Sequence, residues 1–286
     1  MELTHAVLLA IVQGLSEWLP ISSSGHLVLM PHLLGWRDQG LLFDVALHIG
    51  TLVAVVAYFR SELFAMGRAW FGSLKGGGHS ADARLAWCVI IGTVPVGIAG
   101  LLFGGWIEAM LRNPLFVAGT LAFFGLLMWA ADRFGARVRD EHSLTLRDAL
   151  LIGCAQALAL MPGTSRSGVT MTMGRTLGLT REAAARFSFL LAVPGTAMAG
   201  VWEFWEAVTA PGATVDWVPM AVGAAVAAVT GYLCIHWLLS SKKRSIMRGF
   251  NARVPGSTSN TASACAGVAG SVVRGSHPSR VARLWA

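Results

Sequence analysis

Long apolar stretches separated by short polar segments dominate this chain. Four stretches contain no charged residue: 85–107, 114–131, 187–202 and 217–241. A fifth, 41–59, has only Asp44 and His48 as ionisable residues. A helix needs about 20 apolar residues to cross the hydrocarbon core of a bilayer. Five stretches of this kind are more than a soluble core explains, so the pattern predicts an all-α polytopic membrane protein with about five to six transmembrane helices.

Two polar segments, 13–26 and 156–168, interrupt this pattern, and they match each other without gaps at an offset of 143 residues. In this register Gln13 meets Gln156, and Ser22-Ser23-Ser24-Gly25 meets Ser165-Arg166-Ser167-Gly168. Each segment contains Pro and Gly between two short apolar stretches, which is typical of a re-entrant helical hairpin whose irregular backbone lines a cavity. A chance self-match is the alternative interpretation.

The charges between the apolar stretches predict how the chain crosses the membrane. Segments 60–84 and 132–147 and the segment that starts at Lys242 are rich in Arg and Lys, whereas 202–217 carries acids only. Basic segments stay on the cytoplasmic side. The two hairpins then enter from opposite faces, the first from outside, which is the arrangement of an inverted repeat.

The repeat predicts three parts of the chain. Residues 1–131 form a first repeat of one hairpin and three spans, and residues 144–241 form a second repeat of one hairpin and two clear spans. A third span is missing after Lys242, because residues 249–286 are mostly Ser, Gly, Ala and Arg without a long apolar run. We expect this segment to be a disordered tail in place of a last helix.

Composition narrows the classes of function. The chain has 286 residues, of which 55% are hydrophobic and only 13% charged, against about 25% charged in soluble domains. Of its 22 Lys and Arg residues, eight lie from Lys242 onward, so the rest has 14 basic and 15 acidic residues. No folded basic face is left to bind nucleic acid. The four cysteines lack the spacing of metal ligands or of a disulfide framework.

The polar segments supply the chemistry of a phosphate site. Arg166 offers a planar fork of donors that binds phosphate bidentately, and Gly25 lets the backbone approach an anion closely. An acid within an apolar segment is costly and indicates function, so Glu17 is a candidate base or a ligand for a divalent cation. The serines 22–24 are candidate nucleophiles, or they only satisfy backbone groups. His26 is either a reacting group or a packed side chain.

These residues resemble the signatures of the undecaprenyl-diphosphate phosphatases, the bacitracin-resistance family. The resemblance rests on Gln13-x-x-x-Glu17, on the run 20–26 (Pro-Ile-Ser-Ser-Ser-Gly-His) and on the run 162–170 (Pro-Gly-Thr-Ser-Arg-Ser-Gly-Val-Thr), with 44–51 also similar. It extends to about Leu239. It implies hydrolysis of undecaprenyl diphosphate to undecaprenyl phosphate, which recycles the lipid carrier of peptidoglycan synthesis. It also implies the bacterial plasma membrane, a site facing the periplasm or exterior, a homodimer, and dependence on Mg²⁺ or Ca²⁺.

The resemblance also implies roles for individual residues. The family's essential acid corresponds to Glu17, its proposed nucleophile to Ser23, its histidine of disputed role to His26, and its phosphate-binding arginine to Arg166. Supporting substrate contacts would come from Ser22, Ser24, Gly25, Ser165, Ser167 and Thr170. Gln13 occupies a position that is Glu in many members, so a metal held by Gln13 and Glu17 has one ligand charge fewer here. The nucleophile stays open between Ser23, His26 and water.

A membrane transporter or lipid flippase is the competing function, because inverted repeats with broken helices are chiefly a transporter architecture. Phosphate release from a polyprenyl diphosphate separates the two functions. A truncated paralogue without activity is a third possibility.

Overall fold

The computed structural model describes residues 2–37, 39–76, 80–111, 114–136, 138–209 and 216–251. Within these ranges the regular structure is helical, apart from an isolated bridge between Arg139 and Leu179. The chain divides into two compact units, residues 1–239 and 240–286. The first unit contains both serine-rich segments.

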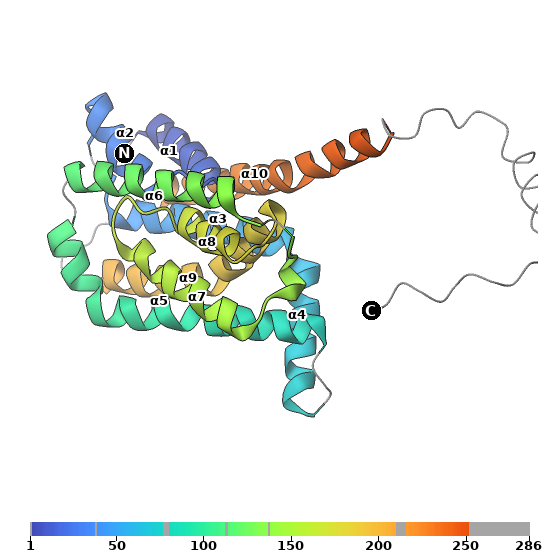
Figure 1. Ribbon diagram of the computed structural model, residues 1–286. Coiled ribbons are helices and arrows are strands. Elements are labelled where there is room, and N and C mark those ends of the chain that lie inside the picture. The colour runs from blue at the N-terminus through green and yellow to red at the C-terminus, as the bar shows by residue number, and fades with distance from the viewer. Residues whose placement is uncertain are drawn as a thin grey trace, which may run out of the picture. The chain divides into compact units, whose positions relative to one another are not determined.

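The helices include the predicted hairpins and spans in order, and one additional helix, Arg60–Leu74, within the basic segment 60–84 (Figure 1). The first half contains α1 (Leu3–Ser16), α2 (Ser23–Leu34), α3 (Leu41–Tyr58), α4 (Arg60–Leu74), α5 (Ala81–Leu111) and α6 (Pro114–Phe134). The second half contains α7 (Leu146–Ala157), α8 (Arg166–Thr176), α9 (Arg181–Thr209) and α10 (Trp217–Asn251), with 3-10 turns at Glu141–Ser143 and Leu158–Leu160.

Four helices of the described chain, α5, α6, α9 and α10, are long and apolar enough to cross a membrane. The apolar segments of these helices are, in the same order, 81–103, 116–134, 181–202 and 217–240. The predicted span near 41–60 is α3, and α4 follows it at a bend of 76°. Figure 1 shows α4 turned away from the other helices at this bend. The prediction of an all-helical, multi-pass membrane protein is confirmed.

The two serine-rich segments form pairs of short helices. α1 and α2 have 14 and 12 residues, and α7 and α8 have 12 and 11. At a rise of 1.5 Å per residue they are about 16 to 21 Å long, too short to cross a hydrocarbon core of about 30 Å. Within each pair the second helix packs against the first. These are the two re-entrant hairpins that the sequence predicts.

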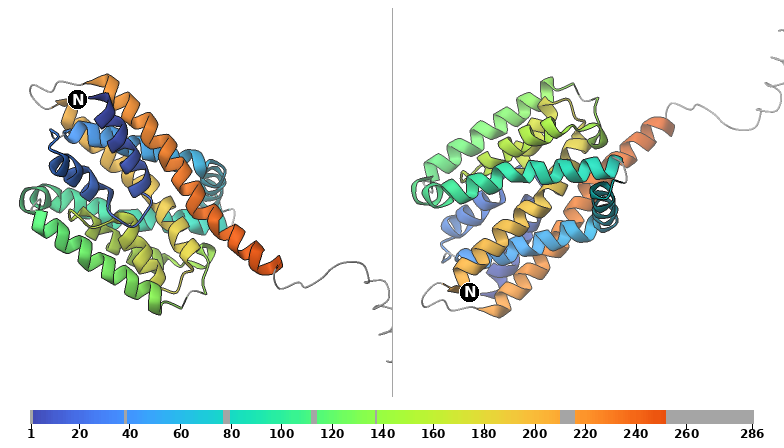
Figure 2. Two further views of the ribbon diagram at one scale, coloured as in Figure 1. Left: turned by 90° about the horizontal axis from the view of Figure 1, so that it is seen from above. Right: turned by 90° about the horizontal axis from the view of Figure 1, so that it is seen from below.

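Each hairpin packs against a span of the other half (Figure 2). α1 lies on α10, where a Cβ atom at Gly14 would meet the Thr230 hydroxyl at 1.9 Å. α7 lies on α5, where a Cβ atom at Gly153 would meet the carbonyl oxygen of Gly92 at 2.3 Å. At both places the absence of a side chain on glycine lets the backbones of the two helices approach closely. Each half of the chain thus supports the hairpin of the other half.

The predicted tail lies almost entirely outside the described residues. α10 ends at Asn251, three residues into the segment 249–286, and residues 252–286 are not described. The division into repeats 1–131 and 144–241 and the missing last span therefore stay predictions. The three described cysteines, Cys88, Cys154 and Cys234, are free.

Candidate active site

The first hairpin turns sharply between Glu17 and Ser23. Glu17 caps the C-terminus of α1, and its backbone N–H donates to the carbonyl of Gln13. Ser22 caps the N-terminus of α2 through its hydroxyl, which accepts from the Gly25 N–H. Ser22 has φ = 64°, the one positive φ of a non-glycine residue in the described part of the chain. Such a conformation is costly and concentrates at functional sites; here it directs Ser23 back toward Glu17.

The second hairpin turns at Gly163, where φ is 87°. A Cβ atom there would come within 2.3 Å of the Thr120 hydroxyl and 2.6 Å of the Val117 carbonyl oxygen on α6. The Thr120 hydroxyl donates to the carbonyl of Pro162 at 2.8 Å. α8 then begins after Ser165, whose hydroxyl caps it by accepting from the Gly168 N–H. α6 thus fixes the loop from which Arg166 starts.

The tips of the two hairpins touch. The Ser167 hydroxyl donates to the carbonyl of Leu19 at 3.0 Å, across 148 positions of sequence. A Cβ atom at Gly168 would lie 3.5 Å from Cβ of Pro20. The polar segments that match in sequence therefore meet in space, as an inverted repeat requires.

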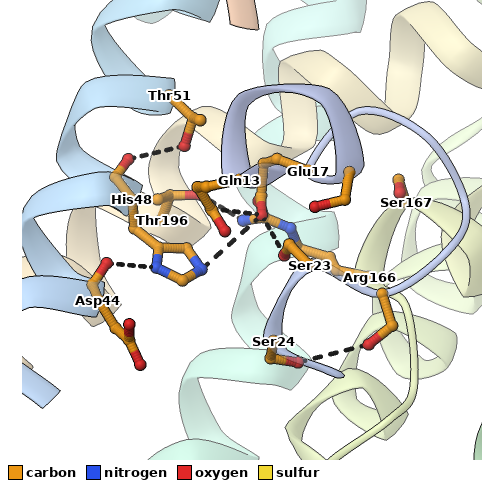
Figure 3. A network of polar contacts seen from close by, with 12 residues as sticks. Gln13, Glu17, Ser23, Ser24, Asp44, His48, Thr51, Arg166, Ser167 and Thr196 are labelled. Carbon is orange, nitrogen blue, oxygen red and sulfur yellow. Dashed lines mark hydrogen bonds and ion pairs between the residues drawn. The ribbon is translucent and has the colours of Figure 1, made fainter. Parts of the chain in front are cut away.

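Glu17 is the centre of the polar cluster where the tips meet (Figure 3). Its carboxylate is buried, with a side chain only 5% exposed. Oε2 accepts from the Ser23 hydroxyl at 2.6 Å and from Nε2 of Gln13 at 3.1 Å. Oε1 accepts from the guanidinium of Arg166. A buried carboxylate needs such partners to remain charged, and the serine is within the distance that proton transfer requires.

Arg166 joins three elements. Its side chain starts at the first residue of α8, pairs with Glu17 from the first hairpin, and donates through a second nitrogen to the hydroxyl of Thr196 on α9. The side chain remains 23% exposed, so an arriving anion can reach it. A guanidinium with several donors can hold a phosphate while it keeps one of these contacts.

The histidine beside Glu17 is His48, not His26. Nε2 of His48 lies 3.7 Å from Oε2 of Glu17, and Nδ1 lies 2.8 Å from the Asp44 carbonyl oxygen. Nδ1 of His26 lies 2.8 Å from the carbonyl of Ser22, within its own helix turn. In the described part of the chain His26 makes no polar contact with Glu17, Ser23 or Arg166. A catalytic role for His26 stays a prediction, and this arrangement does not support it.

The remaining predicted hydroxyl groups, apart from the two capping ones, form hydrogen bonds within the hairpin tips or with the adjacent helix α9. Ser24 is exposed, and its hydroxyl lies 3.4 Å from that of Ser22. The hydroxyls of Ser165 and Ser167 lie 3.2 Å apart. Thr170 donates to the Arg166 carbonyl, and its hydroxyl lies 2.7 Å from that of Ser188 on α9. These contacts fix the backbone around Arg166, and direct binding of substrate by these side chains stays a prediction.

Sequence reasoning missed Thr196, and it noted His48 only as one of two ionisable residues in the stretch 41–59. A signal existed for Thr196, because Gly50-Thr51 on α3 and Gly195-Thr196 on α9 continue the repeat, and α3 packs against α9. The offset of these two pairs is 145 residues, two more than the 143 residues of the hairpins, and this shift hides the match.

The oxygen atoms around Glu17 suit a hard cation only in part. Oε1 of Gln13 is buried without a hydrogen-bond partner, next to the Glu17 carboxylate. Carboxylate and amide oxygens are the ligands that Mg²⁺ and Ca²⁺ prefer. No group of three His, Cys, Asp or Glu side chains within the described ranges is placed to hold a metal. A cation here would therefore need phosphate oxygens of a substrate to complete its coordination.

An apolar groove of about 370 Å³ lies beside the second tip. Its walls come from α6 and from Met161, which directly precedes the Pro162-Gly163 turn; the lining residues are Phe116, Gly119, Thr120, Phe123, Phe124 and Met161. The Leu121 side chain of α6 lies 3.6 Å from where a Cβ atom of Gly25 in the first hairpin would be. α6 therefore passes both tips and carries the groove on the same stretch of helix.

Comparison with known proteins gives a consistent picture. The family model described as Bacitracin resistance protein BacA matches residues 6–252, beyond the Leu239 expected from the motifs. Undecaprenyl-diphosphatase 2 of Stutzerimonas stutzeri is 56% identical over 253 residues, which cover 87% of this chain and 93% of that protein. Undecaprenyl-diphosphatase of Nitrosococcus oceani is 51% identical over 250 residues, covering 87% and 94%. Undecaprenyl-diphosphatase of Alteromonas mediterranea is 52% identical over 240 residues, covering 84% and 90%.

Proposed function

Since this chain belongs to the bacitracin resistance protein BacA family, we propose that it hydrolyses undecaprenyl diphosphate at the cluster of Glu17, Ser23 and Arg166. The products are undecaprenyl phosphate and inorganic phosphate, so the enzyme recycles a lipid carrier for cell-wall synthesis. The observation that carries this assignment is the hydroxyl of Ser23 at 2.6 Å from a carboxylate oxygen of Glu17, whose other oxygen pairs with Arg166.

Arg166 is the anion-binding group, and its pairing with Glu17 is the resting state. A diphosphate carries more negative charge than one carboxylate and binds a guanidinium bidentately. When the terminal phosphate takes over Arg166, Oε1 of Glu17 loses its hydrogen bond from the guanidinium, while Oε2 keeps the Ser23 hydroxyl within reach for proton transfer. The contact with Thr196 keeps the guanidinium in place during this exchange. Substrate binding thereby prepares the base.

Ser23 is the nucleophile in this mechanism. Its oxygen attacks the terminal phosphorus, the bond to the bridging oxygen breaks, and undecaprenyl phosphate departs with the bonding electron pair. The hydroxyl proton passes to Glu17 and from there to the departing lipid phosphate. Water then attacks the phosphoserine and releases inorganic phosphate, while Glu17 transfers a proton from that water to the Ser23 oxygen.

A divalent cation fits beside this chemistry. Glu17 and Oε1 of Gln13 are the protein groups that would hold it, since carboxylate and amide oxygens are ligands that Mg²⁺ and Ca²⁺ accept. When bound, it would neutralise charge that develops on the phosphate oxygens. We expect EDTA to abolish phosphate release and an excess of Mg²⁺ or Ca²⁺ to restore it; full activity after exhaustive chelation would contradict a cation requirement.

The lipid part of the substrate would lie in the apolar groove of α6 and Met161. A polyprenyl tail remains in the hydrocarbon region, so its diphosphate must reach the site sideways from the bilayer. The groove satisfies this because it adjoins the turn that leads into Arg166. Its aromatic lining supplies the contact area that a flexible chain needs for binding.

We further propose that the site opens toward the outer face and that two copies associate. The outward orientation rests on the basic segments 60–84 and 132–147, which favour the cytoplasm. Substrate added outside sealed, right-side-out vesicles should be hydrolysed without lysis. Cross-linking in native membranes should give a species of twice the mass; a protein that stays monomeric there contradicts the dimer.

The decisive experiment measures phosphate release from undecaprenyl diphosphate by purified protein in detergent. Ser23→Ala and Glu17→Gln should each reduce kcat by about 10³-fold or more, as expected for a nucleophile and its base. A phosphoserine at position 23 should accumulate in a brief quench and be absent from Ser23→Ala. Near wild-type turnover of Ser23→Ala would exclude the serine as nucleophile. A transporter without hydrolase activity would release no phosphate with any divalent cation.

A further inference from the structure

The second hairpin contains a buried amide that its fold leaves without a partner. Gln156 lies in the last turn of α7 and is 1% exposed. Neither its amide nitrogen nor its amide oxygen has a hydrogen-bond partner. Burying an unsatisfied polar group costs on the order of 1–3 kcal/mol, so a side chain of this kind needs an explanation.

The repeat explains why the partner is missing. Gln156 is the counterpart of Gln13, whose amide donates to the carboxylate four residues later, Glu17. The residue four positions after Gln156 is Leu160, which offers no side-chain acceptor. The two amides occupy matching places in the two hairpins, and only the first has an acid to bind.

Gln156 also lies close to Thr196, the residue that accepts a hydrogen bond from the anion-binding Arg166. Its Nε2 would be 3.9 Å from a Cβ atom placed on Gly195 of α9. The following residue, Thr196, accepts from Arg166. The amide of Gln156 therefore faces α9 one residue before the threonine that holds Arg166.

From these observations we propose that Gln156 is a substrate-binding residue, whose Nε2 donates to an oxygen of the diphosphate group when substrate occupies the site. The diphosphate would thus be held by one donor from each of two elements, Arg166 on α8 and Gln156 on α7. The inference rests on the proposed function for the identity of the substrate. In the free protein the unpaired amide lowers stability, and a bound anion removes this penalty by accepting a hydrogen bond from it.

The test uses Gln156→Met, which keeps the length of the side chain and removes its donors. Inorganic diphosphate serves as the probe, because its binding raises the melting temperature of the protein without requiring turnover. We expect Gln156→Met to weaken this binding about ten- to a hundredfold, the loss of one hydrogen bond to a charged group. KM for undecaprenyl diphosphate should rise by a similar factor with kcat nearly unchanged, and the melting temperature without ligand should not fall.

Gln39→Met is the matched control. The Gln39 amide nitrogen already donates to the Leu27 carbonyl and to Oδ1 of Asp44. Its loss should lower the melting temperature of the free protein and leave diphosphate binding within about twofold. Gln39→Met should therefore change the stability of the free protein, whereas Gln156→Met should change its affinity for diphosphate.

Gln156→Glu gives a second, independent reading, since it retains the shape and places a negative charge where the donor was. Diphosphate should then no longer stabilise the protein. The inference is overturned if either Gln156 variant binds diphosphate like wild type, or if Gln156→Met lowers the melting temperature as Gln39→Met does. Failure of the proposed function is distinct, because wild-type protein would then release no phosphate from undecaprenyl diphosphate, whatever stands at position 156.

Discussion

Thr196 should contribute measurably to catalysis although no motif includes it. Its hydroxyl is the acceptor that holds the Arg166 guanidinium on α9. Thr196→Val keeps the shape of the side chain and leaves one N–H group of the guanidinium without its acceptor. A hydrogen bond to a charged group contributes about 1.5–3 kcal/mol, which corresponds to about 10- to 150-fold. Because the Arg166 side chain is 23% exposed, water replaces part of this contact, and we expect a loss near the lower limit.

The assay is kcat/KM for phosphate release from undecaprenyl diphosphate. Thr51→Val is the control, because Thr51 occupies the matching place on α3 while its hydroxyl donates only to the His48 carbonyl in its own helix. We expect about a tenfold loss for Thr196→Val and less than threefold for Thr51→Val. Equal losses would mean that any threonine at these positions matters only for packing. Wild-type kinetics of Thr196→Val would refute the role assigned to the Arg166 contact.

Two further predictions concern the groove and a polar contact far from the site. Gly119→Trp should occupy part of the groove, because Gly119 lines it and nothing lies within 4 Å of a Cβ atom there; losing the burial of about two methylene groups of the substrate should raise KM for undecaprenyl diphosphate about tenfold. Kinetics with farnesyl diphosphate check this, and an equal rise for that short chain contradicts the assignment. At the polar start of α7, burial raises the pKa of Asp148, but hydrogen bonds from Arg139 and Thr145 outweigh it and hold the pKa below its ordinary value. A lowered pKa means that this stabilisation is present at neutral pH and is lost progressively as the pH falls below the ordinary pKa of an aspartate, about 4, and through the folded-state pKa. Asp148→Asn should thus lower the melting temperature by about 2–4 °C at pH 7, and a difference that persists undiminished at pH 3 argues against the ion pair.

The apolar pattern of the chain was enough to predict most of the architecture. A bilayer requires long apolar helices and internal satisfaction of backbone groups, so the charge-free stretches identify the spans α5, α6, α9 and α10. The Pro- and Gly-containing segments identify the hairpins for the same reason. The motifs also indicated Glu17, Ser23 and Arg166 as one site, because few polar groups occur elsewhere in the apolar chain.

The pattern could not predict which side chains meet, because that depends on how the helices pack. The contact between Arg166 and Glu17 spans 149 positions, and Thr196 and His48 join it from two long helices whose rotation no local pattern specifies. His26, close to Ser23 in sequence, instead contacts the Ser22 carbonyl. Gln13 and Gln156 look alike in the chain, yet only Gln13 finds an acid. Local polarity determines where a helix lies in the membrane, whereas packing between helices determines which polar group has a partner and which is left for the substrate.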